Sequence, residues 1–150
     1  MRAIIQRVTN CSVTIDQQLK SQIGNGLLIL LGIEENDTET DIEWLVKKII
    51  QMRIFSDENG KMNLSVQDIN GEILVVSQFT LFASTKKGNR PGFTRSARPE
   101  TAIPLYEKFI VETEKHFGKK IQTGMFGADM KVQILNDGPV TIIMDSKQAE

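Results

Sequence analysis

Histidine and cysteine are almost absent from this sequence of 150 residues, which contains one of each, His116 and Cys11. A single cysteine cannot form a disulfide within the chain, and a single histidine cannot supply the imidazole ligands of a typical zinc site. A Cys-His nucleophile pair would have to join these two residues, and no local pattern indicates one. We therefore expect no metal and no other cofactor, and any catalysis should proceed without an imidazole relay.

Long apolar segments and a strong net charge are also missing. The longest apolar run, residues 27–31, is much shorter than the ~20 residues that cross a bilayer, and residues 1–7 lack the apolar core of a signal peptide. With 18 basic and 19 acidic side chains the net charge is −1, so no overall field attracts nucleic acid or anionic lipid. These absences predict a cytoplasmic protein without a membrane partner. Nucleic-acid binding would require a local basic patch.

Apolar periodicity predicts many short strands and two helices. The first helix contains the apolar face from Ile42 to Ile50 and is capped by Asp37 or Thr38, and the second runs through residues 102–117. Pro104 should then lie in the first turn of the second helix, and Gly118 should end it. The predicted strands are residues 2–8, 12–16, 27–33, 52–55, 72–79, 130–135 and 140–144.

The chain has no internal repeat and no flexible linker, so residues 1–150 are predicted to form a single domain. Many strands with only two long helices favour a mixed or antiparallel sheet over regular βαβ winding. We therefore predict the α+β class, with a barrel-like sheet and two amphipathic helices packed on it. Cys11 is expected to be a small buried apolar residue.

Polar side chains end the strand expected over residues 72–79, at Ser77, Gln78 and Thr80. Polar residues in this position often face a functional site, but they also satisfy backbone groups at a strand end. The chain has no Gly-x-Ser-x-Gly motif, which disfavours that type of serine hydrolase. Thr80 would act as a nucleophile only with an unusual base, because a neutral hydroxyl is a weak nucleophile.

Charge is separated between two segments. Residues 86–98 contain five basic residues, no acidic residue and one aromatic residue, Phe93. Such a loop is either solvated or follows RNA phosphates with its cations while the aromatic ring stacks on a base. Residues 34–43 contain six acidic residues, which we interpret as a solvated helix N-terminus and not as a metal site.

Two glycine-containing motifs precede the C-terminus. Residues 136–141, Asn-Asp-Gly-Pro-Val-Thr, form either a tight turn before an edge strand or a cis Gly138-Pro139 peptide that presents carbonyl groups to a ligand. Residues 124–130 form either a glycine-flanked wall for a flat ligand or the bulged entry to a strand. Both alternatives stay open for each motif.

Together these motifs resemble the D-aminoacyl-tRNA deacylase (D-tyrosyl-tRNA deacylase) family. The resemblance is carried by Gln6-Arg7-Val8 and Ser12-Val13 at the start and by residues 77–81 in the middle. Residues 126–130 and 136–141 carry it at the end. It implies a cytoplasmic homodimer that hydrolyses the ester between tRNA and a D-amino acid or a misplaced glycine. The implied role is translation quality control by proofreading, without a DNA partner.

The resemblance also implies how the substrate is selected. In the family the Gly-Pro motif is cis and enters the pocket of the other subunit, where its carbonyl groups leave no space for an L side chain. Here the motif is Gly138 and Pro139, and Arg7 matches the arginine that supports it.

The other expected site residues fall into two groups. The catalytic group matches the pocket strand of the family and consists of Ser77, Gln78, Phe79 and Thr80. The second group is expected to bind the adenosine and tRNA, and comprises Lys86, Lys87, Arg90 and Phe93 of the basic loop with Met125, Phe126, Gly127 and Ala128 of the wall.

An ester to ribose needs only an oriented water, backbone donors for the oxyanion and the neighbouring 2′-hydroxyl of the RNA. We therefore expect substrate-assisted hydrolysis in which Thr80 positions groups, while a role as covalent nucleophile stays open. Two rival functions are a non-enzymatic homodimeric RNA-binding module and a hydrolase of non-RNA esters. In the basic loop, Asn89 and Gly92 occupy positions where Arg and Ser are expected in relatives, which predicts that the loop binds RNA less tightly here.

Overall fold

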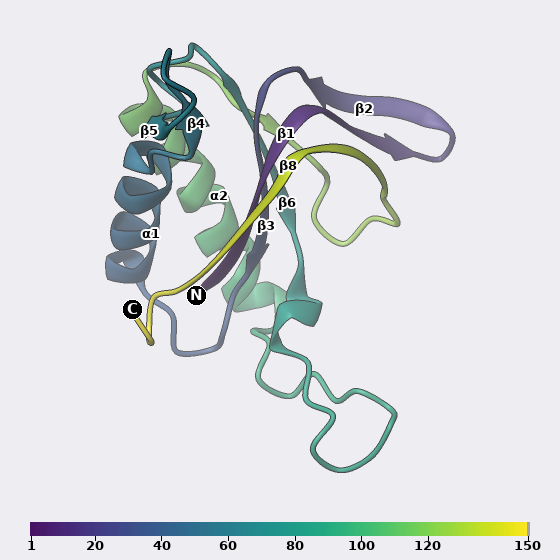
Figure 1. Cartoon of the computed structure of the whole chain (residues 1–150). Helices are drawn as coiled ribbons and strands as arrows, with labels where there is room; N and C mark the ends of the chain where they lie inside the picture. Colours follow the sequence, from purple (N-terminus) through teal and green to yellow (C-terminus); the bar gives the residue numbers. More distant parts are fainter. Residues whose placement is uncertain (150) are drawn as a thin grey trace.

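The computed structural model describes residues 1–149, in which a curved mixed sheet packs against two helices (Figure 1). The helices are α1 (Glu39–Gln51) and α2 (Pro99–Phe117), and a 3-10 helix, η1, spans Phe79–Phe82. The strands are β1 (Arg2–Ile15), β2 (Gln18–Ile23), β3 (Gly26–Gly32), β4 (Phe55–Ser56), β5 (Met62–Leu64), β6 (Glu72–Ser77), β7 (Gln122–Thr123) and β8 (Lys131–Asp145). This arrangement confirms the predicted α+β class.

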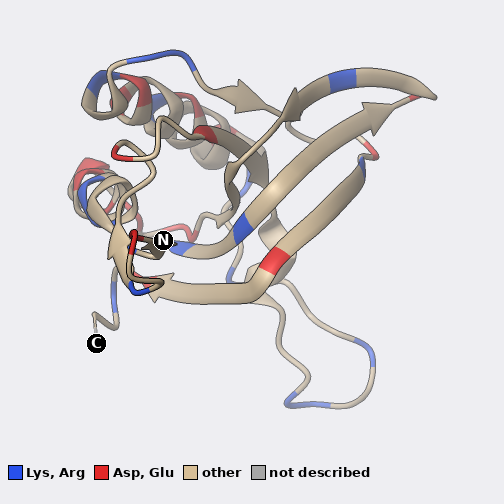
Figure 2. Ribbon diagram, turned by 45° about the horizontal axis from the view of Figure 1, so that its top comes forward, with Lys and Arg blue, Asp and Glu red and all other residues tan. Residues whose placement is uncertain are grey.

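The main sheet has the strand order β2-β1-β3-β6-β7, and β8 also pairs with β1. The β3–β6 and β6–β7 pairs are parallel, whereas β1 is antiparallel to β2, β3 and β8. Parallel neighbours need a long crossover connection, and α1 and α2 supply the two crossovers. Both helices lie on the same side of the sheet (Figure 1). The sheet is strongly curved, as predicted for a barrel-like fold (Figure 2).

Strand β3 is buried on both faces, as its continuous apolar sequence predicts. Leu27 and Ile29 belong to the core between the sheet and the helices, whereas Leu28 belongs to a second cluster with Cys11 and Val76. This alternation follows from the two-residue period of a strand. Burial also raises the pKa of the Cys11 thiol to about 11, which favours the uncharged thiol and agrees with its expected structural role.

The strands at both ends of the chain are longer than predicted. Residues 2–8 and 12–16 were expected to be separate strands, and they form the single strand β1; residues 130–135 and 140–144 likewise join into β8. Gln6 pairs with Thr141 and Val8 pairs with Asn136, so residues 137–140 lie opposite the single residue Arg7. The extra residues must leave the pairing line as a bulge, and this bulge carries the Gly-Pro motif.

Two other strand predictions need correction, and three strands were missed. Met52 is the C-cap of α1, and of the strand expected over residues 52–55 only Phe55 lies in a strand, β4, which also contains Ser56. The strand expected over residues 72–79 ends at Ser77 and is followed by η1. Strands β2, β5 and β7 were not predicted, because they are short or carry few apolar residues.

Of the two predicted caps of α1, Asp37 and Thr38, the structure selects Thr38, which forms a capping box with Asp41. Gly118 ends α2 with φ 81°, a conformation that favours glycine. Pro104 was expected in the first turn, and this expectation is wrong. Pro99 takes the first position, so Pro104 lies inside the helix on its exposed side, where solvent can bond to the carbonyl group it leaves free. No helix among the described residues is both long and apolar enough to cross a membrane.

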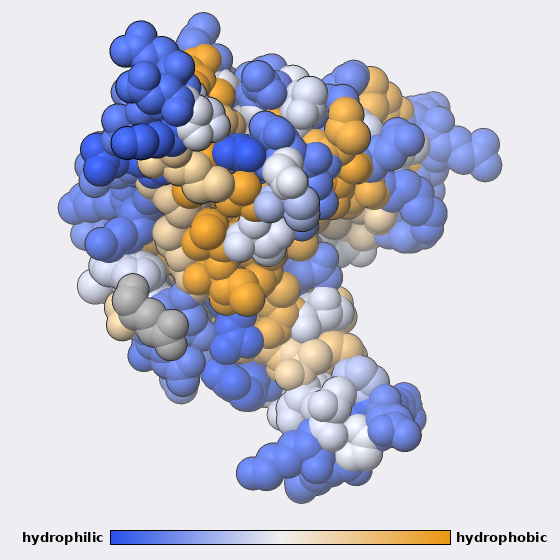
Figure 3. Space-filling model, viewed as in Figure 1, coloured by the Kyte–Doolittle hydropathy of each residue, from blue (hydrophilic) through white to orange (hydrophobic). Residues whose placement is uncertain are grey.

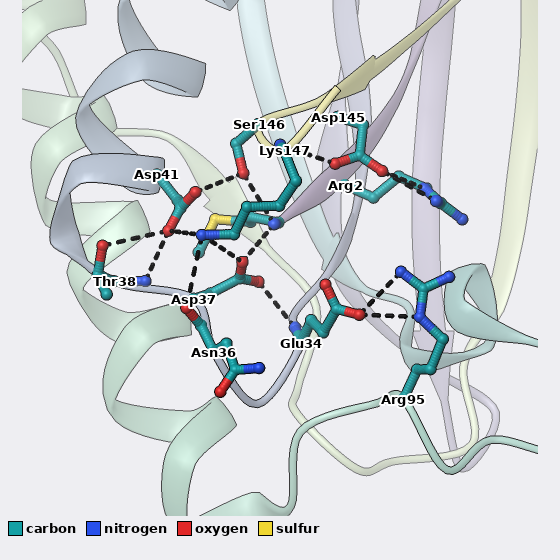
Figure 4. Close-up of polar contacts among 11 residues, drawn as sticks. Arg2, Glu34, Asn36, Asp37, Thr38, Asp41, Arg95, Asp145, Ser146 and Lys147 are labelled. Atoms are coloured by element: carbon teal, nitrogen blue, oxygen red, sulfur yellow. Dashed lines mark hydrogen bonds and ion pairs between the residues drawn. The ribbon is translucent and has the colours of Figure 1, made fainter. Parts of the chain in front are cut away.

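The acidic stretch is only partly solvated, contrary to expectation. Asp37 and Asp41 are buried, and Asp37 contacts the buried ammonium group of Met1. Ser146 Oγ accepts from the same ammonium group at 2.9 Å and donates to Asp41 at 2.6 Å, and the Lys147 ammonium lies 2.9 Å from Asp41 (Figure 4). These carboxylates therefore tie the first and last strands to the start of α1.

Candidate functional site

A cavity of about 270 Å³ opens at the end of β6. Ser77, Gln78 and Phe79 line one side, and residues 126–128 line another. These segments, which were expected to serve catalysis and adenosine binding, therefore meet at one cavity. Thr80 and Met125 are outside the cavity lining and are exposed next to these segments in the chain.

The remaining cavity walls are mostly apolar and were not predicted. They include Ile33 after β3, Ala97 before α2, Ala102 within α2 and Val132 in β8. Small and branched side chains of this kind leave space for a flat ligand between the sheet and a helix. No local sequence signal distinguishes them from ordinary core residues.

Backbone bonding fixes the end of β6 beside the cavity. The Gln78 N–H donates to the Leu31 carbonyl at 2.7 Å, which extends the β3–β6 pairing by one residue. Gly32 permits this approach, because a Cβ there would lie 3.1 Å from both the Gln78 carbonyl oxygen and the Leu81 Cβ. The turn into η1 follows directly, so the side chains of Gln78, Phe79 and Thr80 are presented at the rim.

The Gln78 side-chain amide donates to the Thr80 hydroxyl. A neutral amide can orient a hydroxyl or a water molecule, but it cannot remove the hydroxyl proton. His116 is engaged at the end of α2, where its Nδ1 lies 3.1 Å from the Glu112 carbonyl oxygen. The local chemistry therefore favours positioning over activation of Thr80 as a nucleophile.

Two aromatic rings stand at the rim. Phe79 and Phe93 make an edge-to-face contact with ring centroids 5.2 Å apart, and both rings are partly exposed. The Ser96 hydroxyl donates to the Phe79 carbonyl at 2.8 Å, and the Ala97 N–H donates to the Ile33 carbonyl at 2.9 Å. The segment that carries Phe93 is therefore attached to the pocket strand, and its ring is suited to stacking on a base.

The wall at residues 124–128 is held from behind by α2. The Phe126 ring packs against Tyr106 with centroids 5.7 Å apart, and the Tyr106 hydroxyl donates to the Val75 carbonyl at 3.3 Å. Burial raises the pKa of Tyr106 to about 12, so this hydroxyl stays a neutral donor. Gly127 has φ +79°, a left-handed conformation for which glycine is suited.

The Gly138–Pro139 peptide bond is cis, and both residues are exposed. Arg7 is buried beneath the motif, where its Nε donates to the Asp137 carbonyl at 3.0 Å and its Nη1 donates to the Ile54 carbonyl at 2.6 Å. Neither Gly138 nor Pro139 lines the cavity of the same chain. The structure therefore brings Arg7 to the motif but leaves the motif away from residues 77–79.

The basic loop projects from the body of the molecule (Figure 2). Ser84 and Gly92 close its base with two backbone hydrogen bonds of 2.8 and 2.9 Å. Lys86, Lys87 and Arg90 beyond this base are exposed. Their positions suit them to contact a large anionic partner.

The C-terminal part of the basic loop is docked on the acidic stretch, which was expected to be solvated. Arg95 pairs with Glu34 at 2.8 Å. Glu35 accepts from the Arg98 N–H at 3.1 Å and from the Thr101 hydroxyl at 3.0 Å, which satisfies donors at the start of α2. The opposite charges of the basic loop and the acidic stretch were visible in the sequence, but they did not indicate that the two segments are in contact.

Within residues 1–149 no group of three or more His, Cys, Asp or Glu side chains is arranged to hold a metal ion. The polar side chains that line the cavity are the Ser77 hydroxyl, the Gln78 amide and the Asp129 carboxylate, which also pairs with Lys131 at 3.1 Å. Such groups bind and orient a ligand by hydrogen bonds.

Comparison with known proteins identifies the family. The family model described as D-Tyr-tRNA(Tyr) deacylase matches residues 4–145. D-aminoacyl-tRNA deacylases of Flavobacterium johnsoniae and Parabacteroides distasonis are 65% and 62% identical over 150 residues, with all of each chain covered.

Two solved structures are similar throughout. A "c-Myc DNA Unwinding Element Binding Protein" is 45% identical with a TM-score of 0.92, covering 97% of this chain and 98% of that one. A "probable eukaryotic D-amino acid tRNA deacylase" is 15% identical with a TM-score of 0.83, covering 95% and 97%, and it shares the fold. From the matches of family model and curated relatives over nearly all its length, the chain belongs to the D-Tyr-tRNA(Tyr) deacylase family.

Proposed function

We propose that this chain is a D-aminoacyl-tRNA deacylase that releases D-amino acids or mischarged glycine from tRNA and rejects L-aminoacyl-tRNA. Its family makes it a hydrolase of the aminoacyl-tRNA ester bond. The observation that carries the finer proposal is the cavity shared by residues 77–79 and 126–128. The proposal treats residues 1–150 as one deacylase domain acting in the cytoplasm; residue 150 lies outside the described range.

The substrate is assigned to the cavity by the chemistry of its walls. The partly apolar wall at residues 125–128 accepts the terminal adenosine, and the end of β6 faces the aminoacyl ester. Phe93 supports a base by stacking, while Lys86, Lys87 and Arg90 contact phosphates of the acceptor stem. In this proposal the cavity binds the terminal adenosine and the ester by shape and apolar contact, and the projecting basic loop binds the tRNA phosphates by electrostatic attraction.

The Gly138–Pro139 motif acts in this proposal as a chirality filter in the cavity of a second subunit. Three observations support an action in trans: the motif is exposed, it projects as a bulge from β8, and it does not line its own cavity. Backbone carbonyl groups meeting the amino-acid moiety would exclude an L side chain by steric overlap. Arg7 holds the motif in place through the Asp137 carbonyl.

The homodimer is supported by the exposed edge of β8. Within the described chain β8 pairs only with β1, and it exposes Ile134, Leu135 and Ile143, the last at 68%. Apolar atoms gather on the face between α1 and the end of β8 (Figure 3). Exposed apolar side chains on an unpaired strand edge are typical of a surface that a partner covers.

Hydrolysis is proposed to be assisted by the substrate. A water molecule attacks the ester carbonyl carbon, backbone N–H groups stabilise the oxyanion, and the bond to the ribose oxygen breaks with transfer of a proton to that oxygen. The products are the free amino acid and tRNA. The neighbouring 2′-hydroxyl of the ribose supplies proton transfer, and Thr80, bonded to Gln78, positions the reacting groups.

Thr80→Ala separates the two roles left open for this residue. If Thr80 only positions groups, the variant should keep a measurable single-turnover rate, within about tenfold to a hundredfold of the wild type. Thr80→Ser, which keeps the hydroxyl, is the matched control. Complete loss of turnover in a folded Thr80→Ala variant that still binds tRNA would overturn the positioning role and favour a covalent nucleophile.

A non-enzymatic nucleic-acid-binding module is the second candidate, because the 45% identical structure is named as a DNA-element-binding protein. The deacylase and the binding module are distinguished by incubating the chain with D-tyrosyl-tRNA and following release of D-tyrosine beside a control without the protein. Accelerated release supports the deacylase. Binding of the tRNA without release, or preferential binding of duplex DNA, would support the module.

A further inference from the structure

The turn that presents Phe79 and Thr80 has little support of its own. Helix η1 consists of four residues and contains the Leu81 N–H to Gln78 carbonyl bond at 3.2 Å and the Ala83 N–H to Thr80 carbonyl bond at 3.0 Å. Short 3-10 segments have poorer hydrogen-bond geometry than α-helices. The orientation of the two side chains must therefore depend on contacts from other elements.

Arg2 of β1 binds the turn directly. Its Nη1 donates to the Leu81 carbonyl at 2.8 Å, and its Nε and Nη2 donate to Asp145 Oδ2 at 3.1 and 2.9 Å (Figure 4). The guanidinium carbon also lies 4.8 Å from the ring centroid of Phe82. One side chain thus joins the end of β8 to two residues of the turn.

Arg95 approaches the same ring from the basic loop. Its Nε and Nη2 each lie 2.8 Å from Glu34 Oε1, and its guanidinium carbon lies 5.3 Å from the Phe82 centroid (Figure 4). The next residue, Ser96, donates to the Phe79 carbonyl. The contacts made by Arg95 are therefore directed at the turn and at Glu34.

We propose that Arg2 and Arg95 are positioning residues for deacylation, which hold the turn Phe79–Phe82 in place through Leu81, Phe82 and Glu34 and do not contact RNA. The inference rests on the proposed role of Phe79 and Thr80. It divides the basic residues near the site into two groups. Lys86, Lys87 and Arg90 bind the substrate, whereas Arg2 and Arg95 orient the groups that act on it.

Kinetics distinguish the two groups. Arg2→Met should lower kcat about tenfold, and Arg95→Met about threefold because its side chain is 55% exposed. KM for tRNA and its salt dependence should change less than about twofold, since no phosphate contact is lost. Lys86→Met and Lys87→Met are the matched comparison, for which KM should rise and the salt dependence should weaken with little change in kcat.

Conservative and exchanged variants test the geometry. Arg2→Lys cannot reproduce the planar fork that reaches Asp145 and Leu81 together, so it should recover only part of the lost kcat. Glu34→Arg and Arg95→Glu should each lower kcat, and the double exchange should restore it in part. These variants also retain the test if Arg2→Met fails to fold.

Hydrogen exchange supplies a readout that does not depend on turnover. In folded Arg2→Met the amides of Leu81 and Ala83 should exchange at least about fivefold faster, while amides of β3 and β6 remain unchanged. Faster exchange with an unchanged kcat would overturn the inference while leaving the proposed function intact. A raised KM with a weakened salt dependence in Arg95→Met would also overturn it. Unchanged turnover in Phe79→Ala and Thr80→Ala together would instead contradict the proposed site.

Discussion

Arg7 shows how a single buried side chain supports an exposed motif. It connects β1 to the Asp137 carbonyl in the bulge of β8 and to the Ile54 carbonyl after α1, and it lies 3.4 Å from the Asp137 carboxylate. Only a guanidinium group offers several donors in one rigid plane. A Cβ at Gly138 would lie 3.0 Å from Arg7 Nη2, so the absence of a side chain at this position is required for the close approach.

Replacement of Arg7 by methionine should therefore damage both stability and selectivity. The buried Ile54 carbonyl and the partly buried Asp137 carbonyl would lose charged donors, which costs about 2–4 kcal/mol of unfolding free energy. The ratio of D to L release should also fall, because the motif is no longer held. Urea unfolding and paired release assays measure the two effects, with Arg7→Lys as the control that keeps the charge. Wild-type stability and selectivity in Arg7→Met would refute the supporting role.

At the level of elements, α1 is tied to the last strand through its N-terminal turn. Asp41 accepts from the Thr38 N–H at 2.7 Å within the capping box and also contacts Ser146 and Lys147. Burial acts to raise the pKa of Asp41, but hydrogen bonds from Ser146, Lys147 and Thr38 outweigh it and hold this pKa well below its usual range. The folded chain therefore strongly favours the charged carboxylate.

This shift predicts how stability depends on pH. A carboxyl with a lowered pKa in the folded state stabilises that state above its unfolded pKa of about 3.9, and the contribution is lost as the pH falls towards the folded pKa. The unfolding free energy should decrease between about pH 5 and pH 2. Asp41→Asn should be less stable at pH 7 and show a smaller decrease, measured by urea unfolding. An equal acid dependence in the variant and the wild type would assign the effect to other groups.

For the whole molecule, local patterns predicted much of the fold. The apolar period of α1 and the turn at Gly118 depend on neighbouring residues, and both were predicted; the cap was narrowed to Asp37 or Thr38, of which Thr38 is observed. The bulge of β8 depends on pairing between Arg7 and a segment 130 residues away, which no local pattern contains. For the same reason two separate strands were predicted at each end of the chain.

The candidate site shows the same division. The expected site residues were 77–80 and 125–128, and the structure brings residues 77–79 and 126–128 to one cavity, without Thr80 and Met125. Ile33 and Ala102 were missed because an apolar wall residue has no chemical signature in sequence. The Glu34–Arg95 pair was missed because its partners are 61 residues apart. The separation of acidic and basic segments was visible in the sequence, but the ion pair that joins them was not.

The proposed dimer predicts a change in assembly for one surface residue. Ile143→Lys places a charge on the exposed apolar face of β8 and should shift the chain towards monomer, raising the dimer dissociation constant at least about tenfold, ~1.4 kcal/mol. Sedimentation velocity across a concentration series measures this. Val111→Lys is the matched control, because Val111 is 60% exposed on α2. An unchanged dimer in Ile143→Lys would exclude this face as the interface.

The proposed backbone-built site should release D-amino acids and exclude L-amino acids, and this selectivity is measured by single-turnover release from paired D- and L-tyrosyl-tRNA. The wild-type chain should release D-tyrosine at least about 100-fold faster than L-tyrosine, a difference of ~2.7 kcal/mol in the barrier. Glycyl-tRNA, which has no side chain to exclude, should also be hydrolysed. Equal release of D- and L-tyrosine would rule out the proposed chirality filter.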